Sequence, residues 1–382
     1  MNTTKKLAML IAGCMLQSGP GLLAQQAVQR GTLKATFADK FDIGTALSLK
    51  QIYERDRKAR PLIESQFNAL TAENCMKAMY LQPREGEFNF KDADRFVEYG
   101  EKHGMRLIGH TLIWHSQAPA WFFKGKDGRD VSREVLIERM RKHIHTVVSR
   151  YKGRIKGWDV VNEAILDNGE WRRSKFYDII GEDFVRLAFQ FAREADPQAQ
   201  LYYNDYSMFL EGKRKGVISM VRQLQQQGVR IDGIGMQGHL NIDYPKVSDF
   251  ENSLLAFAAL GVKVMVTEMD ISVLPSPRQT MGAEVSTNFK YDKRLNPYAK
   301  ELPQDKQQLL GQRYKDFFAL FLKHRDKIDR VTLWGVTDGD SWKNNWPVPG
   351  RTDYPLLFDR NHQPKPFVWD IIDMATAKNN MN

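Results

Sequence analysis

The sequence predicts an α/β fold of the (β/α)8 class, a TIM barrel built as a single domain. Short apolar runs alternate with longer amphipathic segments along the 382 residues, and polar side chains repeatedly stand at the ends of the apolar runs. Strands that alternate with helices form a parallel sheet through right-handed crossovers, which bring all strand C-termini to one face. In a closed barrel that face carries the active site.

Eight apolar runs have the length expected of buried strands. They cover residues 41–46, 67–70, 106–110, 157–162, 200–204, 233–237, 263–267 and 330–336. Helical periodicity is found over residues 88–103, 131–150, 174–196, 213–227 and 250–260. Gly104, Gly228 and Gly261 follow three of these segments, where glycine is typical of a helix C-terminus.

The connection at residues 272–305 is longer than the others and contains four prolines and several aromatic residues. A loop of this length is often functional. The alternative is an insertion that only adds surface.

Most of the chemically unusual side chains are predicted to lie at one end of the barrel, because they stand at the C-terminal ends of the apolar runs. They are Glu73, Asn74, His110, Asn162, Glu163, Asn204, Asp205, Gln237, His239, Glu268 and Asp270, with Trp334 in the eighth run. A random distribution would place such residues at both ends of the strands.

Two glutamates about a hundred residues apart, Glu163 and Glu268, each follow an apolar run. A pair of carboxyl groups about 5–5.5 Å apart is what retaining glycoside hydrolysis requires, with one acid and one nucleophile of different pKa. We expect Glu163 to be the acid/base and Glu268 the nucleophile, with His239 and Asp270 orienting Glu268. The alternative is that each glutamate forms a salt bridge or caps a loop.

Tryptophans are numerous, and indole rings pack well against the C–H faces of sugars. Trp158 lies in the middle of a run and is expected in the core, whereas Trp334 and Trp342 are better placed for substrate. Asn162, next to the acid, could hydrogen-bond the sugar 2-hydroxyl in the transition state. The alternative for Asn162 is a buried amide that only satisfies backbone groups.

Other chemistries have weaker support. His110 and His115 raise the possibility of a metallohydrolase, but the first apolar run carries no His-x-His pair. No Gly-x-Ser-x-Gly turn and no glycine-rich phosphate loop is present. A net charge of +10 is spread along the chain without a basic cluster, so we expect no nucleic-acid partner. The expected site contains no metal and needs no cofactor.

The N-terminus resembles an export signal. Lys5 and Lys6 precede an apolar run at 7–16 that is too short to span a bilayer. We expect residues 1–24 to be a signal peptide cut after Ala24, and residues 25–382 to form the catalytic domain. The alternative is a lipoprotein signal cut before Cys14, which would leave Cys75 as the only other cysteine and no internal disulfide. Both predict a secreted, periplasmic or lipid-anchored protein without a transmembrane segment.

Six motifs resemble glycoside hydrolase family 10, the retaining endo-β-1,4-xylanases, over roughly residues 36–376. They are Thr-Ala-Glu-Asn at 71–74, Gly-His-Thr-Leu-Ile-Trp-His at 109–115, Trp-Asp-Val-Val-Asn-Glu at 158–163, Tyr-Asn-Asp-Tyr at 203–206, Gly-Met-Gln-Gly-His at 235–239 and Thr-Glu-Met-Asp at 267–270. Two residues depart from the family pattern: Ser207 stands where Asn is frequent, and Leu240 where Trp is common. Both affect contacts on the leaving-group side.

The resemblance implies the same roles for Glu163 and Glu268 and for their supports, His239 and Asp270. It also implies substrate binding by Glu73, Asn74, Lys77, His110, Trp114, Asn162, Tyr206, Gln237, Trp334 and Trp342. In this pattern Trp342 crowds the position where glucose carries its hydroxymethyl group, so xylose is favoured.

The expected activity is therefore retaining endo-hydrolysis of xylan or xylo-oligosaccharides by a monomer. Three alternatives stay open: a retaining β-glycanase or β-glycosidase acting on glucans, a non-catalytic glycan-binding barrel, and a metallohydrolase.

Overall fold

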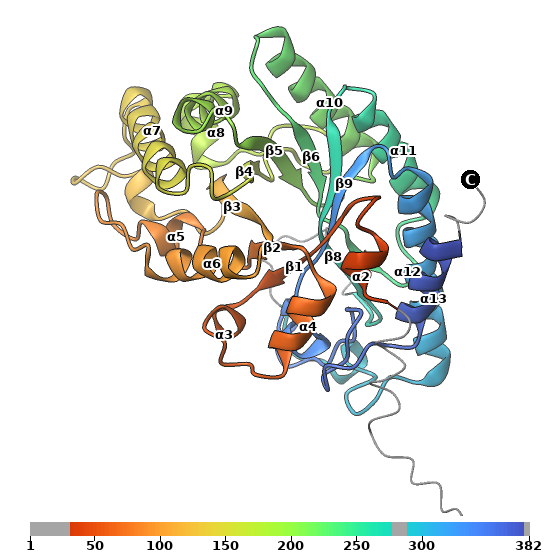
Figure 1. The fold of residues 1–382 in the computed structure, drawn as a ribbon. Coiled ribbons are helices and arrows are strands. Elements are labelled where there is room, and N and C mark those ends of the chain that lie inside the picture. Colours follow the sequence, from red (N-terminus) through yellow and green to blue (C-terminus); the bar gives the residue numbers. More distant parts are fainter. Residues whose placement is uncertain (1–30, 277–288, 378–382) are drawn as a thin grey trace, which may run out of the picture.

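The computed structural model describes residues 31–276 and 289–377 (Figure 1). The predicted signal region, with its alternative cleavage before Cys14, lies outside the described residues, as does the central part of the 272–305 connection. Within the described ranges, no helix is long and apolar enough to cross a membrane.

The strands form one closed parallel barrel surrounded by helices, which confirms the predicted (β/α)8 fold (Figure 1). In chain order they are β1 (Asp42–Leu47), β2 (Ala69–Ala72), β3 (Arg106–Trp114), β4 (Gly157–Asn162), β5 (Gln200–Asp205), β6 (Gly233–Met236), β7 (His239–Asn241), β8 (Lys263–Ser272) and β9 (Ile328–Leu333). Pairing of β1 with β9 and of β6 with β8 closes the sheet. The short β7 pairs with the far end of β8, so β6 and β7 together form the sixth barrel strand.

Helices cover the outside of the barrel between successive strands. The longer ones are α6 (Lys91–Lys102), α7 (Arg133–Arg150), α9 (Asp183–Ala195), α10 (Glu211–Gln226), α11 (Val247–Ala258), α12 (Gln304–Lys323) and α13 (Phe367–Ala377). Shorter helices are α2 (Leu33–Thr36), α3 (Leu49–Ile52), α4 (Ala59–Gln66), α5 (Ala78–Leu81) and α8 (Lys175–Ile180). Gly104, Gly228 and Gly261 have φ of +62°, +71° and +77°, so the predicted glycine termini are confirmed.

Several predicted boundaries were wrong, including the three that follow. The helix expected over 174–196 is two helices, α8 and α9, because Gly181 at φ +82° ends the first one. The helix expected from residue 88 begins at Lys91, since Phe88 and Phe90 stack on each other ahead of it, with ring centroids 5.3 Å apart. Strand β3 continues past His110 to Trp114, so His110 lies inside the strand and not at its end.

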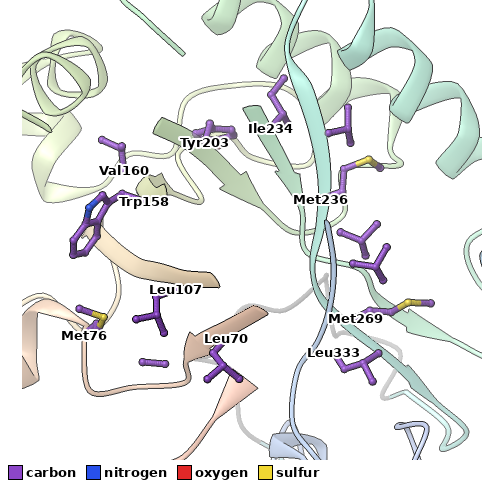
Figure 2. Packing of buried hydrophobic residues seen from close by; sticks show 14 of the residues in the cluster. Leu70, Met76, Leu107, Trp158, Val160, Tyr203, Ile234, Met236, Met269 and Leu333 are labelled. Atoms are coloured by element: carbon purple, nitrogen blue, oxygen red, sulfur yellow. The ribbon is translucent and has the colours of Figure 1, made fainter. Parts of the chain in front are cut away.

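The core lies mainly between the outer face of the barrel and the helices. Figure 2 shows part of it, with Leu70, Met76, Leu107, Trp158, Val160, Tyr203, Ile234, Met236, Met269 and Leu333. Trp158 is fully buried, as expected, and its ring fits only because Gly109 lies opposite; a Cβ on Gly109 would approach the ring to 2.1 Å. Inside the barrel, Ile108, Tyr202 and Met265 form a second buried cluster. Because side chains in a strand alternate between faces, His110 shares the inner face with Ile108.

Candidate active site

One pocket of about 160 Å³ collects the predicted site residues from most of the barrel strands. Its lining is Glu73, Asn74, Lys77, His110, Trp114, Gln117, Asn162, Glu163, Gln237, His239, Glu268, Trp334 and Trp342. All predicted site residues line it except Asp270 and Tyr206, and Gln117 is an addition that the sequence did not indicate. Gln117 follows the end of β3, where its φ of +50° is unusual for a residue with a side chain.

A larger cavity of about 870 Å³ lies between α12 and the chain segment that follows β9. Its buried carboxylate, Asp338, forms an ion pair with Lys365 at 2.9 Å. Paired charges of this kind are common in structural networks, whereas the smaller pocket brings together two glutamates that are joined by hydrogen bonds through Asn204 and Asn162. We therefore place the candidate active site in the smaller pocket.

Glu163 directly follows β4 and is 4% exposed. Its Oε2 accepts a hydrogen bond from Trp114 Nε1 at 2.8 Å, and its Oε1 accepts from Gln237 Nε2 at 3.0 Å and from Asn162 Nδ2 at 3.2 Å. Burial raises the pKa of Glu163, which favours a protonated carboxyl group. Its φ of +59° is rare for a residue other than glycine, so its backbone is held by its surroundings.

Glu268, in β8, is equally buried but has the opposite electrostatic environment. Its Oε1 accepts a hydrogen bond from Asn204 Nδ2 at 2.8 Å, and its Oε2 lies 3.2 Å from His239 Nε2. Burial alone would raise the pKa of Glu268, but the hydrogen bond with His239 and the nearby His110 outweigh burial, and the pKa is lowered. Glu268 is therefore held as a carboxylate.

His239 is fixed between two carboxylates. Its Nδ1 lies 3.0 Å from Asp270 Oδ2, on the side opposite Glu268, and Trp342 Nε1 donates to the same oxygen of Asp270 at 2.8 Å. Burial acts to lower the pKa of His239, but Asp270 and Glu268 raise it to about 9. Asp270 is fully buried behind the imidazole, which explains its absence from the pocket lining.

A buried amide bridge connects the two glutamates. Asn204 Nδ2 donates both to Glu268 and to Asn162 Oδ1, the latter at 3.0 Å, and Asn162 donates onward to Glu163. Thr267 Oγ1 donates to Asn204 Oδ1 at 2.6 Å, which fixes the orientation of the amide. The sequence placed Asn204 at a strand end but assigned it no role; its motif, Tyr-Asn-Asp-Tyr at 203–206, was the available signal.

The side chains that follow β2 form one wall of the pocket. Lys77 Nζ donates to Asn74 Oδ1 at 3.0 Å and lies 5.0 Å from the centre of the Trp114 ring. Burial raises the pKa of Glu73 and lowers that of Lys77. This wall offers a carboxyl group, an amide and an amine to sugar hydroxyls.

His110 forms the base of the pocket next to Trp334. Its Nδ1 lies 2.9 Å from Asp159 Oδ2, and its ring meets Trp334 edge to face at 5.3 Å. Trp334 directly follows β9 and is not inside the strand as predicted.

Tyr206 lies behind Glu163 and does not line the pocket. It is 5% exposed, and its hydroxyl accepts a hydrogen bond from Arg172 Nη2 at 2.7 Å. The Nε of Arg172 donates to the backbone carbonyl of Glu163 at 2.9 Å. Arg172 therefore ties the strained backbone of Glu163 to the end of β5, a connection that the sequence did not indicate.

Two buried carboxyl groups with opposite pKa shifts, at the C-terminal end of a barrel, are suited to one acid and one nucleophile. Within residues 31–276 and 289–377, no group of three His, Cys, Asp or Glu side chains is arranged to hold a metal ion. The fold and the site define a glycoside hydrolase.

Comparison with known proteins identifies the family. The model of glycosyl hydrolase family 10 matches residues 32–374. Endo-1,4-beta-xylanase A of Xylanibacter ruminicola is 50% identical over 97% of this chain and 99% of its own length, and the endo-1,4-beta-xylanase of Geobacillus stearothermophilus is 40% identical over 90% and 98%. A GH10 endoxylanase structure from a sugarcane soil metagenome has a TM-score of 0.87 and 48% identity, covering 90% of this chain and 99% of its own. The chain belongs to glycosyl hydrolase family 10.

The raised pKa of His239 predicts a pH-dependent contribution to stability. Because its pKa rises from 6.5 to about 9 on folding, the contribution is complete below pH 6.5 and is lost as the pH rises through about 9. The shift corresponds to roughly 3 kcal/mol. Thermal unfolding should show a larger loss of Tm between about pH 6 and pH 9.5 for the wild type than for His239→Asn. Parallel curves for the two proteins would contradict this assignment.

The contact of Arg172 with the Glu163 carbonyl predicts a selective effect on acid catalysis. In Arg172→Met, kcat/KM should fall about 10–100-fold on oligosaccharides and much less on aryl glycosides with good leaving groups, which need little protonation. The neighbouring Arg173 has a 73% exposed side chain paired with Asp178, so Arg173→Met is the matched control and should be nearly neutral. Equal losses on both substrate types would assign Arg172 a purely structural role.

Proposed function

We propose that this chain is an endo-1,4-β-xylanase that hydrolyses internal β-1,4-xylosidic bonds of xylan with retention of anomeric configuration. The observation that carries the proposal is the opposite electrostatic environment of Glu163 and Glu268 within one pocket. The similar Xylanibacter and Geobacillus proteins are endo-1,4-beta-xylanases, which supports xylan as the substrate.

In the first step, Glu268 attacks the anomeric carbon while Glu163 gives its proton to the departing glycosidic oxygen. The bond to the leaving sugar breaks, that sugar departs with a new hydroxyl group, and an ester joins Glu268 to the remaining sugar. The hydrogen bonds from His239 and Asn204 hold Glu268 ionised and oriented before attack.

In the second step, Glu163 acts as a base. It removes a proton from water, the oxygen of which attacks the anomeric carbon and displaces Glu268. Two displacements at the same carbon restore its original configuration. Asn162 and Gln237, which donate to Glu163 Oε1, would contact the sugar in the same pocket.

The proposed binding roles fit the positions of the pocket residues. Glu73, Asn74 and Lys77 would bind sugar hydroxyls on the non-reducing side, and Gln117 lies beside them. Trp342 is held in place by Asp270 and by stacking on Trp346 at 4.5 Å. A ring fixed in this way resists displacement by a hydroxymethyl group, which supports a preference for xylose over glucose.

Product analysis tests the proposal. The protein should release short oligosaccharides from glucuronoxylan and little from carboxymethyl cellulose, and early-time NMR should show the β-anomers first. Preferential release of oligosaccharides from carboxymethyl cellulose would indicate that the substrate is a glucan. Products that appear first as α-anomers would overturn the two-step mechanism. Binding of xylan without any products would favour a non-catalytic glycan-binding barrel.

We also propose that the protein is exported and acts as a monomer without a nucleic-acid partner. The N-terminal sequence supports export, with cleavage after Ala24 or before Cys14. Mass spectrometry of the mature protein distinguishes the two cleavage sites, and light scattering measures the oligomeric state.

The nucleophile assignment predicts that Glu268→Ala lowers kcat on xylan by roughly 10⁴-fold or more, since no covalent intermediate can form. The circular dichroism spectrum should remain that of the wild type. Azide, which fits the space left by the carboxylate, should restore turnover of an activated aryl xylobioside and give an α-glycosyl azide. Full activity of the variant on xylan would refute the role of Glu268.

The acid/base assignment predicts a substrate-dependent loss for Glu163→Ala. Hydrolysis of xylan, the leaving group of which needs protonation, should fall by at least about 100-fold more than the first step on an aryl xylobioside with a good leaving group. Burst kinetics on the aryl substrate measure that first step. A uniform loss on both substrates would count against proton donation by Glu163.

A further inference from the structure

A buried lysine, Lys343, lies at the oxygen of Asp270 that does not contact His239. It belongs to the short 3₁₀ helix η4 (Trp342–Asn344), which follows β9, and its backbone N–H donates to Ser341 Oγ at 3.2 Å. Lys343 is only 7% exposed. Lysine is almost never buried to this extent unless its charge is compensated, so the neighbours of the ammonium group explain its position.

Two indole rings hold the ammonium group in place. Lys343 Nζ lies 4.8 Å from the centre of the Trp342 ring and 5.3 Å from that of Trp346. A cation at such a distance is attracted by the electron-rich face of an indole. Because the two rings also stack on each other, they form one support for the amine beside Asp270.

Asp270 has one carboxylate oxygen to offer this amine. Its Oδ2 is already shared by His239 and Trp342, whereas its buried Oδ1 forms no hydrogen bond within the described ranges and lies 3.9 Å from Lys343 Nζ. Burial acts to raise the pKa of Asp270, but His239 and Lys343 outweigh burial, and the pKa is lowered. The ammonium group is therefore a second counter-charge of Asp270, in addition to the imidazole.

Other charged and titratable groups also face the two carboxylates of β8, Glu268 and Asp270. They come from β3, β7, α12 and the connections after β2, β4 and β9, and they are His110, His239, Tyr314, Lys77, Glu163 and Lys343. Lys343 also acts on the buried carboxyl group of Asp353. A substitution at Lys343 leaves every other member of this set in place, so its effect can be measured separately.

We propose that Lys343 is a positioning residue that keeps Asp270 ionised and thereby holds His239 and Glu268 ready for attack on the sugar. This inference rests on the proposed xylanase function, in which Glu268 must be a carboxylate. A neutral side chain at position 343 removes one positive charge from the surroundings of Asp270 and Glu268, so both keep their protons to a higher pH. Because coupled groups titrate together, the loss of activity at low pH reports the pair.

The pH dependence of kcat/KM in Lys343→Met tests the proposal. The substrate is an aryl xylobioside with a good leaving group, which needs little protonation, so the rate reports attack by Glu268. The acidic limb should move to higher pH by about half a unit or more, since Met keeps the length of the side chain but not its charge. Lys343→Arg, which keeps the charge, should retain the wild-type limb.

Lys40→Met is the matched control. Lys40 is a second buried lysine, paired with Asp39 at 2.6 Å, and it precedes β1 at the opposite end of the barrel from the pocket. This variant should lower the Tm without moving the acidic limb. If Lys343→Met does not fold, Lys343→Gln provides the same loss of charge.

Two results would overturn the role of Lys343 while the proposed function stands. One is a wild-type acidic limb in a folded neutral variant, and the other is an equal shift in Lys343→Arg, which would mean that packing and not charge is responsible. Failure of the wild-type protein to cleave xylan would instead overturn the proposed function, and this inference with it.

Discussion

The rest of the site depends on the burial of two glutamates in one pocket. A buried carboxyl group costs free energy unless it is neutral or well hydrogen-bonded. Glu163 and Glu268 satisfy this constraint in different ways. Glu163 accepts hydrogen bonds from the neutral groups of Trp114, Gln237 and Asn162, whereas Glu268 lies beside His239. The opposite pKa shifts of the two carboxyl groups, and the different roles proposed for them, follow from their partners and not from their residue type, which is the same.

The barrel supplies these partners because its strands deliver side chains from distant parts of the sequence to one end. Asn162 ends β4, Asn204 lies in β5, and His239 begins β7, yet each is within hydrogen-bond distance of a glutamate. The position of His239 needs a further step, since the sixth barrel strand is interrupted at Gln237 and Gly238. Resuming as β7, the strand pairs His239 with Asp270 in parallel register.

The fold and the pocket could largely be predicted from the sequence, since apolar runs with polar ends mark both the strands and the active face. Contacts that depend on loop geometry could not. Arg172 lies beyond any strand, and only the path of the chain after β4 brings it to the Glu163 carbonyl. Tyr206 belongs to a recognisable motif, but its burial behind Glu163 depends on Arg172 and Lys213. Gln117 reaches the pocket through a backbone conformation with positive φ, which its residue type does not indicate.

Asp270 connects substrate selection to the chemistry. One of its oxygens, Oδ2, lies within hydrogen-bond distance of His239 and accepts from Trp342, and its other oxygen faces Lys343 at 3.9 Å. The imidazole beside Glu268, the proposed nucleophile, and the indole proposed to exclude a hydroxymethyl group thus share one anchor. Groups that share hydrogen-bond partners in a buried network do not make independent contributions to the free energy. A change intended to admit glucose by moving Trp342 will therefore also alter His239, so specificity at this site cannot be widened without a cost in the ionisation or placement of Glu268.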